Sequence, residues 1–120
     1  MTLRWEVDLE LVEPWLAGLD QDSYEQIIAA LELLEERGPQ LGRPLVDTVN
    51  DSRHRNMKEL RPGSSGHSEL RILFAFDPER KGILLVAGDK SGNGKKWYKI
   101  NIPIADARFD EHLRKRRGEG

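Results

Sequence analysis

The chain contains no cysteine and no long apolar run. The lack of cysteine among its 120 residues excludes disulfide bonds and thiolate catalysis, and it is compatible with a reducing cytoplasm. No apolar stretch approaches the roughly 20 residues that cross a membrane. The first residues also lack the pattern of a secretory signal. We therefore expect a cytoplasmic protein that has no membrane partner.

Signatures of metal and nucleotide sites are also lacking. The histidines His54, His67 and His112 are scattered, and no HExxH motif or carboxylate cluster accompanies them. The glycine-rich stretch GDKSGNGK does not fit the phosphate-binding pattern GxxxxGK followed by Ser or Thr. That pattern would need glycine at Asp89 and a hydroxyl residue at Lys96. We therefore expect neither a metal nor another cofactor.

Charge is divided unevenly along the chain. Residues 1–36 carry one basic and ten acidic residues, net −9, whereas residues 37–120 carry 18 basic and 11 acidic residues, net +7, which leaves −2 overall. Such asymmetry points to a face that binds a polyanion. A solvated amphipathic helix would explain the acidic front segment equally well. The length and the 38% hydrophobic content fit one soluble domain, residues 1–120.

Periodicity predicts an α+β protein. The best-marked element is a helix in which Ser23 and Gln26 have capping-box spacing and Ile27, Leu31 and Leu34 form an apolar stripe. Later apolar stretches are separated by turn-rich segments, which predicts an antiparallel meander. The expected elements are a strand at 4–10, a short helix from Pro14 to about Leu19, a helix at 23–38, an extended connection at 38–56, strands at 57–61, 68–76 and 82–90, and a closing helix at 103–116.

Strand alternation places two arginines on one face of the sheet. If Leu70 and Ile72 face the helices, Arg71 faces the open side, and the same rule places Arg61 there. Lys90 ends the third strand beside them. The loop that follows brings further cations and two aromatic rings to the rim of this face, namely Lys95, Lys96, Trp97, Tyr98 and Lys99. Such a surface suits an RNA backbone and unstacked bases.

Structural interpretations of the same residues stay open at this point. Arg71 would pair across the sheet with Glu59 or Glu69, which is a common stabilising arrangement, and Arg61 would do likewise. Trp97 and Tyr98 would cover the edge of the core, the more frequent position of aromatic residues. The lysines would then only solubilise a loop.

Several motifs together resemble a known family. The segments LLEERGPQLGRPLVDTV, NMKELRP, ELRILFAFDP, GILLVAGDKSGN and IPIADARFDEHL are similar to RelE/HigB-type toxins of bacterial type II toxin–antitoxin systems, in the RelE/ParE superfamily. The similarity runs from about Leu33 to Leu113. It implies a small α+β RelE-like fold with N-terminal helices packed on an antiparallel, mixed-edge sheet and a C-terminal helix.

The resemblance further implies an mRNA interferase, an endoribonuclease that cuts mRNA on the ribosome without a metal or cofactor. A ribose 2′-hydroxyl attacks the adjacent phosphorus and leaves a 2′,3′-cyclic phosphate. The catalytic residues carried over from the family are Arg61, Arg71, Lys90 and Tyr98. The RNA-binding residues are Lys95, Lys96, Trp97, Lys99 and His54, a histidine in a loop that precedes KELR.

The resemblance also implies partners and rival functions. The expected partners are mRNA on the ribosome, including ribosomal RNA, and a cognate helix-turn-helix antitoxin, with operator DNA bound only through that antitoxin. The chain is slightly acidic, whereas many such toxins are strongly basic, so a weaker general attraction to RNA is expected. The alternatives are a ParE-like inhibitor of DNA gyrase and a catalytically decayed antitoxin-binding module.

Overall fold

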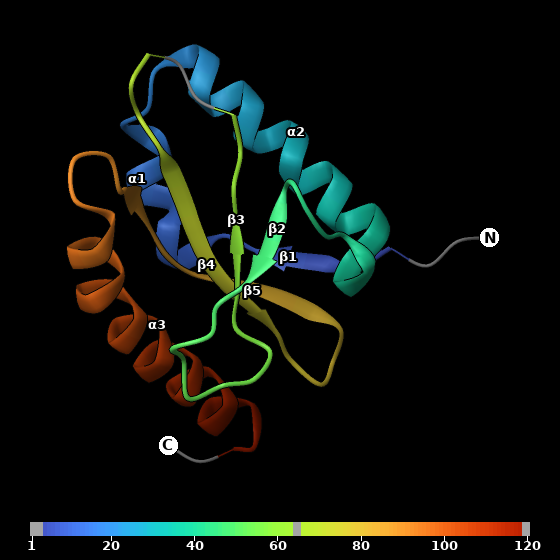
Figure 1. The fold of residues 1–120 in the computed structure, drawn as a ribbon. Coiled ribbons are helices and arrows are strands. Elements are labelled where there is room, and N and C mark those ends of the chain that lie inside the picture. The colour runs from blue at the N-terminus through green and yellow to red at the C-terminus, as the bar shows by residue number, and fades with distance from the viewer. Residues whose placement is uncertain (1–3, 64–65, 119–120) are drawn as a thin grey trace.

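The computed structural model describes residues 4–63 and 66–118, which form a mixed sheet with helices on both sides (Figure 1). The predicted α+β class, with N-terminal helices, a mixed-edge sheet and a C-terminal helix, is confirmed. The elements are β1 (Glu6–Asp8), the 3-10 turn η1 (Glu10–Val12), α1 (Glu13–Ala17), α2 (Gln21–Arg37), the 3-10 turn η2 (Gly38–Gln40), β2 (Val46–Thr48), β3 (Lys58–Leu60), β4 (Leu70–Phe76), β5 (Lys81–Asp89) and α3 (Gly94–Arg116).

The sheet has the order β1-β5-β4-β3-β2. Strands β3, β4 and β5 form the predicted antiparallel meander. Strand β2 adds to one edge in antiparallel orientation, and β1 adds to the other in parallel orientation. Strand β2 lies in the segment 38–56, which was predicted to be an extended connection, so that prediction missed a strand.

Helix α2 begins one turn earlier than its sequence pattern predicted. Asp20 is the N-cap, and its carboxylate accepts a hydrogen bond of 3.0 Å from the backbone N–H of Ser23. The predicted cap, Ser23, is instead buried inside the helix. The helix ends at Gly38, which has a φ of +57°, a conformation that favours glycine.

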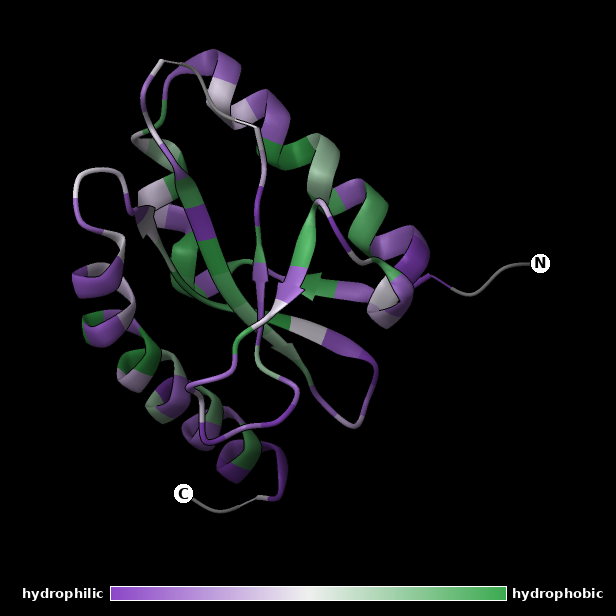
Figure 2. Cartoon of the chain, in the orientation of Figure 1, coloured by the Kyte–Doolittle hydropathy of each residue, from purple (hydrophilic) through white to green (hydrophobic). Residues whose placement is uncertain are grey.

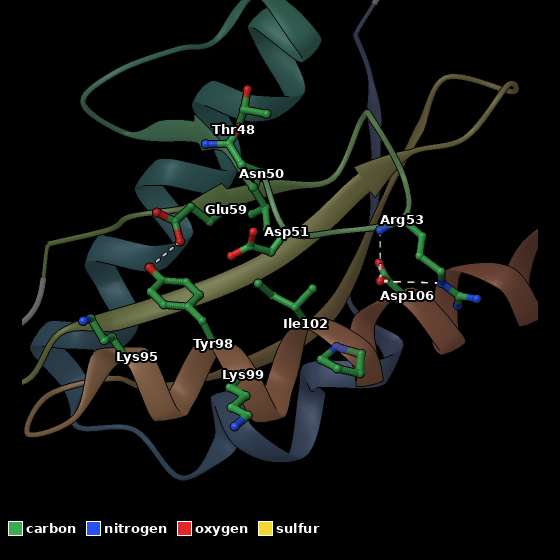
Figure 3. A pocket seen from close by; sticks show the side chains of 12 residues that line it. Thr48, Asn50, Asp51, Arg53, Glu59, Lys95, Tyr98, Lys99, Ile102 and Asp106 are labelled. Atoms are coloured by element: carbon green, nitrogen blue, oxygen red, sulfur yellow. Dashed lines mark hydrogen bonds and ion pairs between the residues drawn. The ribbon is translucent and has the colours of Figure 1, made fainter.

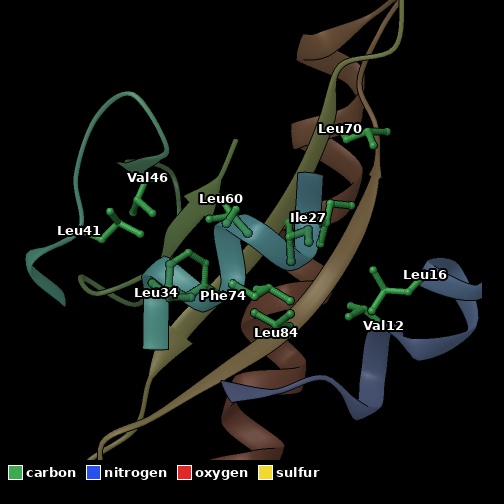
Figure 4. Packing of buried hydrophobic residues seen from close by; sticks show 13 residues of the cluster. Val12, Leu16, Ile27, Leu34, Leu41, Val46, Leu60, Leu70, Phe74 and Leu84 are labelled. Carbon is green, nitrogen blue, oxygen red and sulfur yellow. The ribbon is translucent and has the colours of Figure 1, made fainter. Parts of the chain in front are cut away.

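One face of the sheet is covered by α1 and α2. The core on this side includes Ile27 and Leu34 from α2, Leu60 from β3, Phe74 from β4 and Leu84 from β5, all completely buried (Figure 4). Colouring by hydropathy shows hydrophobic and hydrophilic residues alternating along α2, as expected for an amphipathic helix (Figure 2). The acidic front segment is therefore an amphipathic layer with an apolar inner side.

The second face of the sheet is covered by α3, so the expectation that this face is open was wrong. Alternation does hold, since Leu73 and Ala75 point away from the α2 side and pack with Leu85 and Phe109. The helix was predicted to begin at Pro103, but it begins nine residues earlier at Gly94. Asn93 provides the N-cap because its side chain accepts a hydrogen bond of 3.1 Å from Lys96 N.

Two polar clamps attach the later part of α3 to the rest of the fold. Asp106 accepts hydrogen bonds from the hydroxyl of Ser52 and the backbone N–H of Arg53. One turn from the end of the helix, His112 Nε2 lies 2.7 Å from an oxygen of the buried Asp77. These contacts fix the position of α3 and thereby of the side chains on its first turns. None of the helices in the described ranges is long and apolar enough to cross a membrane.

Candidate functional site

The predicted residues Arg61, Arg71 and Tyr98 meet on the sheet face under the first turns of α3. Strand β3 supplies Glu59, and Arg61 follows this strand, whereas Arg71 lies in β4 and Tyr98 in α3. The Tyr98 hydroxyl donates a hydrogen bond of 2.6 Å to Glu59 Oε2, and Arg61 Nε lies 3.9 Å from Glu59 Oε1. Glu59 is 9% exposed, so its carboxylate is held in the interior of this cluster.

No carboxylate of the described residues neutralises Arg71. Its Nη1 donates to the carbonyl oxygen of Leu70 at 2.8 Å, and its buried Nε has no hydrogen-bond partner within residues 4–63 and 66–118. Neither Glu59 nor Glu69 lies within ion-pair distance of Arg71 in the described part of the chain: Glu59 contacts Tyr98 and Arg61, and Glu69 contacts Lys90. The cross-strand pair that would have made Arg71 purely structural is therefore not formed, and the guanidinium of Arg71 instead acts on the hydroxyl of Tyr98.

Tyr98 is held in its protonated form. Burial raises the pKa of Tyr98, and the hydrogen bond and negative charge of Glu59 raise it further, to about 12, although the guanidinium of Arg71 opposes the rise. At neutral pH the hydroxyl is therefore a hydrogen-bond donor and not a base. Any role of Tyr98 in chemistry must use its proton or its position.

Trp97 lies beside Tyr98, and the two rings make an edge contact with centroids 5.2 Å apart. A Cβ atom at Gly88 would come within 2.6 Å of Trp97 Nε1, so glycine is required for the ring to lie over β5. Gly88 is also the register partner of Arg71. Both aromatic rings are partly buried and pack against the α3-side core, so they support the fold at this point. Contact of Trp97 with RNA stays a prediction.

The predicted lysines occupy different surroundings. Lys90 pairs with Glu69 at 3.1 Å, and its side chain is 21% exposed. Lys95 and Lys99 lie on the same side of α3 as Tyr98 and line a groove, whereas Lys96 is exposed and does not line it. Lys95, Lys96 and Lys99 were predicted to lie in a glycine-rich loop, but they lie on the first turns of α3, and the helix fixes the direction of each side chain.

His54 lies apart from the arginines. Its Nε2 is 2.8 Å from an oxygen of Asp110, and its ring makes an edge contact with Phe109. Asp110 follows Tyr98 by twelve residues, about 18 Å along the helix at 1.5 Å per residue. The structure therefore does not bring His54 together with Arg61, Arg71 and Tyr98. Its predicted role in RNA binding stays a prediction.

The groove beside this cluster has a volume of about 910 Å³. We call it the α3 groove: it runs between the segment 48–53 and the first half of α3 (Figure 3), and it is lined by Thr48, Val49, Asn50, Asp51, Arg53, Glu59, Lys95, Tyr98, Lys99, Ile102, Pro103 and Asp106. The hydrogen bond between Tyr98 and Glu59 forms part of its wall. The groove therefore opens directly beside Arg61, Arg71, Tyr98 and Glu59, which we call the arginine cluster.

Comparison with known proteins identifies the family. Residues 14–110 match the model of the "Phage derived protein Gp49-like (DUF891)" family. The chain belongs to this family. It is also similar to two proteins of Mycobacterium tuberculosis, with 60% identity to "Putative toxin HigB2" and 53% identity to "Putative toxin HigB3", each over 93% of this chain. The matched region spans 56% of the length of the first relative and 96% of the second. Both names agree with the HigB-type resemblance of the sequence.

The sequence analysis assigned too small a role to Glu59, one residue of the candidate site. Glu59 was considered only as an ion-pair partner of Arg71 or Arg61; the structure pairs it with Arg61 and adds a hydrogen bond from the hydroxyl of Tyr98. The available signal was alternation, which places Glu59, Arg61 and Arg71 on one face of the sheet. The segment 48–53 was also missed as a groove wall, because its position depends on the distant contact between Ser52 and Asp106.

The described parts of this Gp49-like chain hold no cluster of three or more His, Asp or Glu side chains that would suit a metal ion. The charged groups at the candidate site are the guanidinium groups of Arg61 and Arg71 and the carboxylate of Glu59. Arginine has a planar fork of donors that matches the oxygens of a phosphate group. The site is thus suited to bind a phosphate and to stabilise additional negative charge on it.

Proposed function

We propose that this chain is the toxin of a type II toxin–antitoxin system and that it acts as a metal-independent, ribosome-dependent mRNA interferase in the cytoplasm. The observation that carries the proposal is the convergence of Arg61, Arg71, Tyr98 and Glu59 beside a groove with two lysines. An inhibitor that acts only by protein contact has no need for an unneutralised arginine on a covered sheet face. The relationship to proteins named as HigB toxins supports the same class.

The reaction requires two proton transfers and the stabilisation of negative charge on the phosphoryl group. The ribose 2′-oxygen forms a bond to phosphorus while the bond from phosphorus to the 5′-oxygen breaks. The 2′-hydroxyl must lose a proton, the phosphoryl oxygens must be stabilised as their charge increases, and the leaving 5′-oxygen must gain a proton. The products are a 2′,3′-cyclic phosphate and a 5′-hydroxyl end.

The geometry supports a specific division of these roles. Arg71 and Arg61 bind the phosphoryl oxygens, and Lys90 adds positive charge at the end of β5. Glu59 is a carboxylate at this point and is able to accept the proton of the 2′-hydroxyl. Tyr98 stays protonated because its pKa is about 12, so it orients the 2′-hydroxyl or donates a hydrogen bond to an oxygen of the reacting group. The leaving 5′-oxygen takes its proton from solvent water.

The proposed partners follow from this function. The substrate is mRNA in the decoding site of the ribosome, and the bound chain also contacts the neighbouring ribosomal RNA. A cognate antitoxin with a helix-turn-helix domain neutralises the toxin and carries it to operator DNA. Recovery of the chain from its host without such a protein would count against the pairing.

The decisive experiment is to express the chain with and without the gene of its antitoxin and to map the 5′ ends of cellular mRNA. We expect new ends at in-frame positions of translated messages, each with a 5′-hydroxyl, only when the antitoxin is absent. DNA damage without new mRNA ends would indicate a gyrase inhibitor. Normal growth with unchanged mRNA would indicate a decayed binding module.

A reconstituted reaction tests the chemistry of the cut. Cleavage by the purified chain on programmed ribosomes should persist after EDTA treatment once enough magnesium is restored to keep the ribosomes intact. Zinc bound to the purified chain in equimolar amount, with loss of cleavage when it is removed, would contradict the proposed mechanism.

A further inference from the structure

The α3 groove carries charges of both signs that have no partner. Asp51, Lys95 and Lys99 are exposed on its walls, and within residues 4–63 and 66–118 none of these side chains makes an ion pair or hydrogen bond. Other charged groups of the groove are occupied, since Glu59 accepts from Tyr98 and Arg53 pairs with Asp110. The groove thus has an unused carboxylate on one side and two unused cations on the other (Figure 3).

The space between these charges is partly apolar and large enough for a small ligand. Val49 and Ile102 line the groove and are 7% and 6% exposed, and Pro103 is a further apolar residue of its lining. The volume of about 910 Å³ lies within the usual range of small-molecule sites, roughly 300–1,000 Å³. Apolar surface of this kind suits the flat faces of an aromatic base.

We propose that the α3 groove binds one unstacked guanine nucleotide of the substrate RNA, with the base at Asp51 and the flanking phosphates at Lys95 and Lys99. This inference rests on the proposed function and names the part of the RNA that the groove selects. A carboxylate only accepts hydrogen bonds, and guanine offers two adjacent donors, N1–H and the N2 amino group, on its Watson–Crick edge. Uracil offers a single donor between two carbonyl oxygens, so it fits a carboxylate poorly.

A nucleotide satisfies both kinds of unpaired charge, whereas an acidic peptide would satisfy only the lysines. Carboxylates of such a peptide would face Asp51 and repel it. The position of the groove also fits a continuous RNA strand, because Tyr98 belongs to the arginine cluster and to the groove wall. A strand whose phosphate lies at Arg61 and Arg71 would therefore place an adjacent nucleotide in the groove.

Binding of short RNAs to the purified chain tests this selectivity without any cleavage. The probes are two fluorescent 2′-O-methyl pentamers, UUGUU and UUUUU, measured by fluorescence anisotropy. We expect the wild-type chain to bind UUGUU about tenfold more tightly, within the range for one good bidentate contact to a base. Asp51→Asn should abolish the preference, and Lys99→Ala should weaken both pentamers by a similar factor.

Matched variants on the opposite layer provide the controls. Glu32→Gln and Arg37→Ala change exposed charges of α2 and should leave both affinities unchanged. Asp51 is itself exposed, so its substitution should not disturb folding. A circular dichroism spectrum and an unfolding midpoint equal to those of the wild type would verify this.

The outcomes separate this inference from the proposed function. Equal wild-type affinity for the two pentamers would overturn the guanine site, even if mRNA cleavage is observed. Guanine preference that depends on Asp51, in a chain that cuts no RNA, would support the site and refute the nuclease. If Asp51→Asn and Lys99→Ala leave RNA binding unchanged and weaken only the antitoxin complex, the groove is a protein interface and the inference is wrong.

Discussion

The two faces of the sheet differ in what they bury. On the α2 side the core is built from apolar residues such as Ile27, Leu34 and Phe74. On the α3 side the core is also apolar, but three carboxylates are buried with it: Glu59 contacts Tyr98, Asp77 contacts His112, and Asp106 contacts Ser52. Burial of a carboxylate costs free energy unless hydrogen bonds or charges compensate it.

This difference indicates that the α2 face contributes mainly to stability, whereas the α3 face also carries the candidate site. The α2 face gains its stability mainly from the packing of apolar side chains. The α3 face combines packing with polar contacts, and it is also where Arg71 has no carboxylate partner among the residues that the structure describes. Substitutions on the first face should therefore act on folding, and substitutions at the candidate site should act on activity.

The largest effect is expected from Phe74→Ala on the α2 face. Phe74 is completely buried and makes an edge contact with Phe76 at 5.7 Å between ring centroids. Loss of a buried phenyl ring typically costs about 3–5 kcal/mol, a large share of the stability of a small domain. Denaturant unfolding of Phe74→Ala and of the milder Phe74→Leu measures this cost. A loss below about 1 kcal/mol for the alanine variant would show that the α2-side core is not the main source of stability.

Arg71→Ala should produce an effect of nearly equal size in a different quantity. Removal of one preorganised donor that binds the transition state typically lowers the rate by about 10²–10³, or roughly 3–4 kcal/mol. Stability should change by only about 1 kcal/mol, because one hydrogen bond to the Leu70 carbonyl is lost from a half-buried side chain. Single-turnover cleavage on ribosomes and denaturant unfolding measure the two quantities.

Arg71→Lys sharpens this test. Lysine keeps the positive charge but lacks the planar fork, so it should recover only part of the lost rate. Binding of the antitoxin serves as the control and should stay normal in both variants. An alanine variant that arrests growth as strongly as the wild type, at equal protein level, would place the active site elsewhere.

The sequence predicted the meander and the two arginines because both follow from local alternation. Arg61 and Arg71 were assigned to one face by a rule that needs only the strand pattern. The coverage of that face was not predicted, because the glycine-rich stretch after Lys90 concealed the cap at Asn93 and Pro103 resembled a helix start. A proline inside a helix is disfavoured, so packing of α3 against the sheet must compensate for it.

The contacts that shape the groove could not be predicted from the sequence because they join residues far apart in the chain. Ser52 and Asp106 lie 54 positions apart, and no periodicity relates a residue in a turn to one in a distant helix. The pairing of His54 with Asp110 has the same character. These contacts depend on how α3 crosses the sheet, which is a property of the assembled fold.

A smaller effect is expected at Asp77, where α3 is clamped to the turn between β4 and β5. Burial alone would raise the pKa of Asp77, but hydrogen bonds from His112 and from the backbone N–H groups of Lys81 and Glu79 outweigh burial and hold it below its ordinary value. Because the pKa is lower in the folded state, ionised Asp77 stabilises the fold above its unfolded-state pKa of about 3.9. This stabilisation is lost as the pH falls through the lower, folded-state value.

Asp77→Asn should therefore reduce the free energy of unfolding by roughly 1–3 kcal/mol at pH 7, as expected for a buried group that loses charged hydrogen bonds. The difference from the wild type should shrink as the pH falls below about 3.9, because the wild-type carboxyl group then becomes neutral as well. Denaturant unfolding at a series of pH values measures both effects. Asp47→Asn is the control, since Asp47 pairs with Arg43 at the exposed edge of the sheet and should contribute much less. The wild type and Asp77→Asn could instead differ in the free energy of unfolding by the same amount at pH 7 and at the lowest pH at which the fold persists. The contact between Asp77 and His112 would then act through shape and not through charge. The polar character of the α3 face would have to be explained by the candidate site alone.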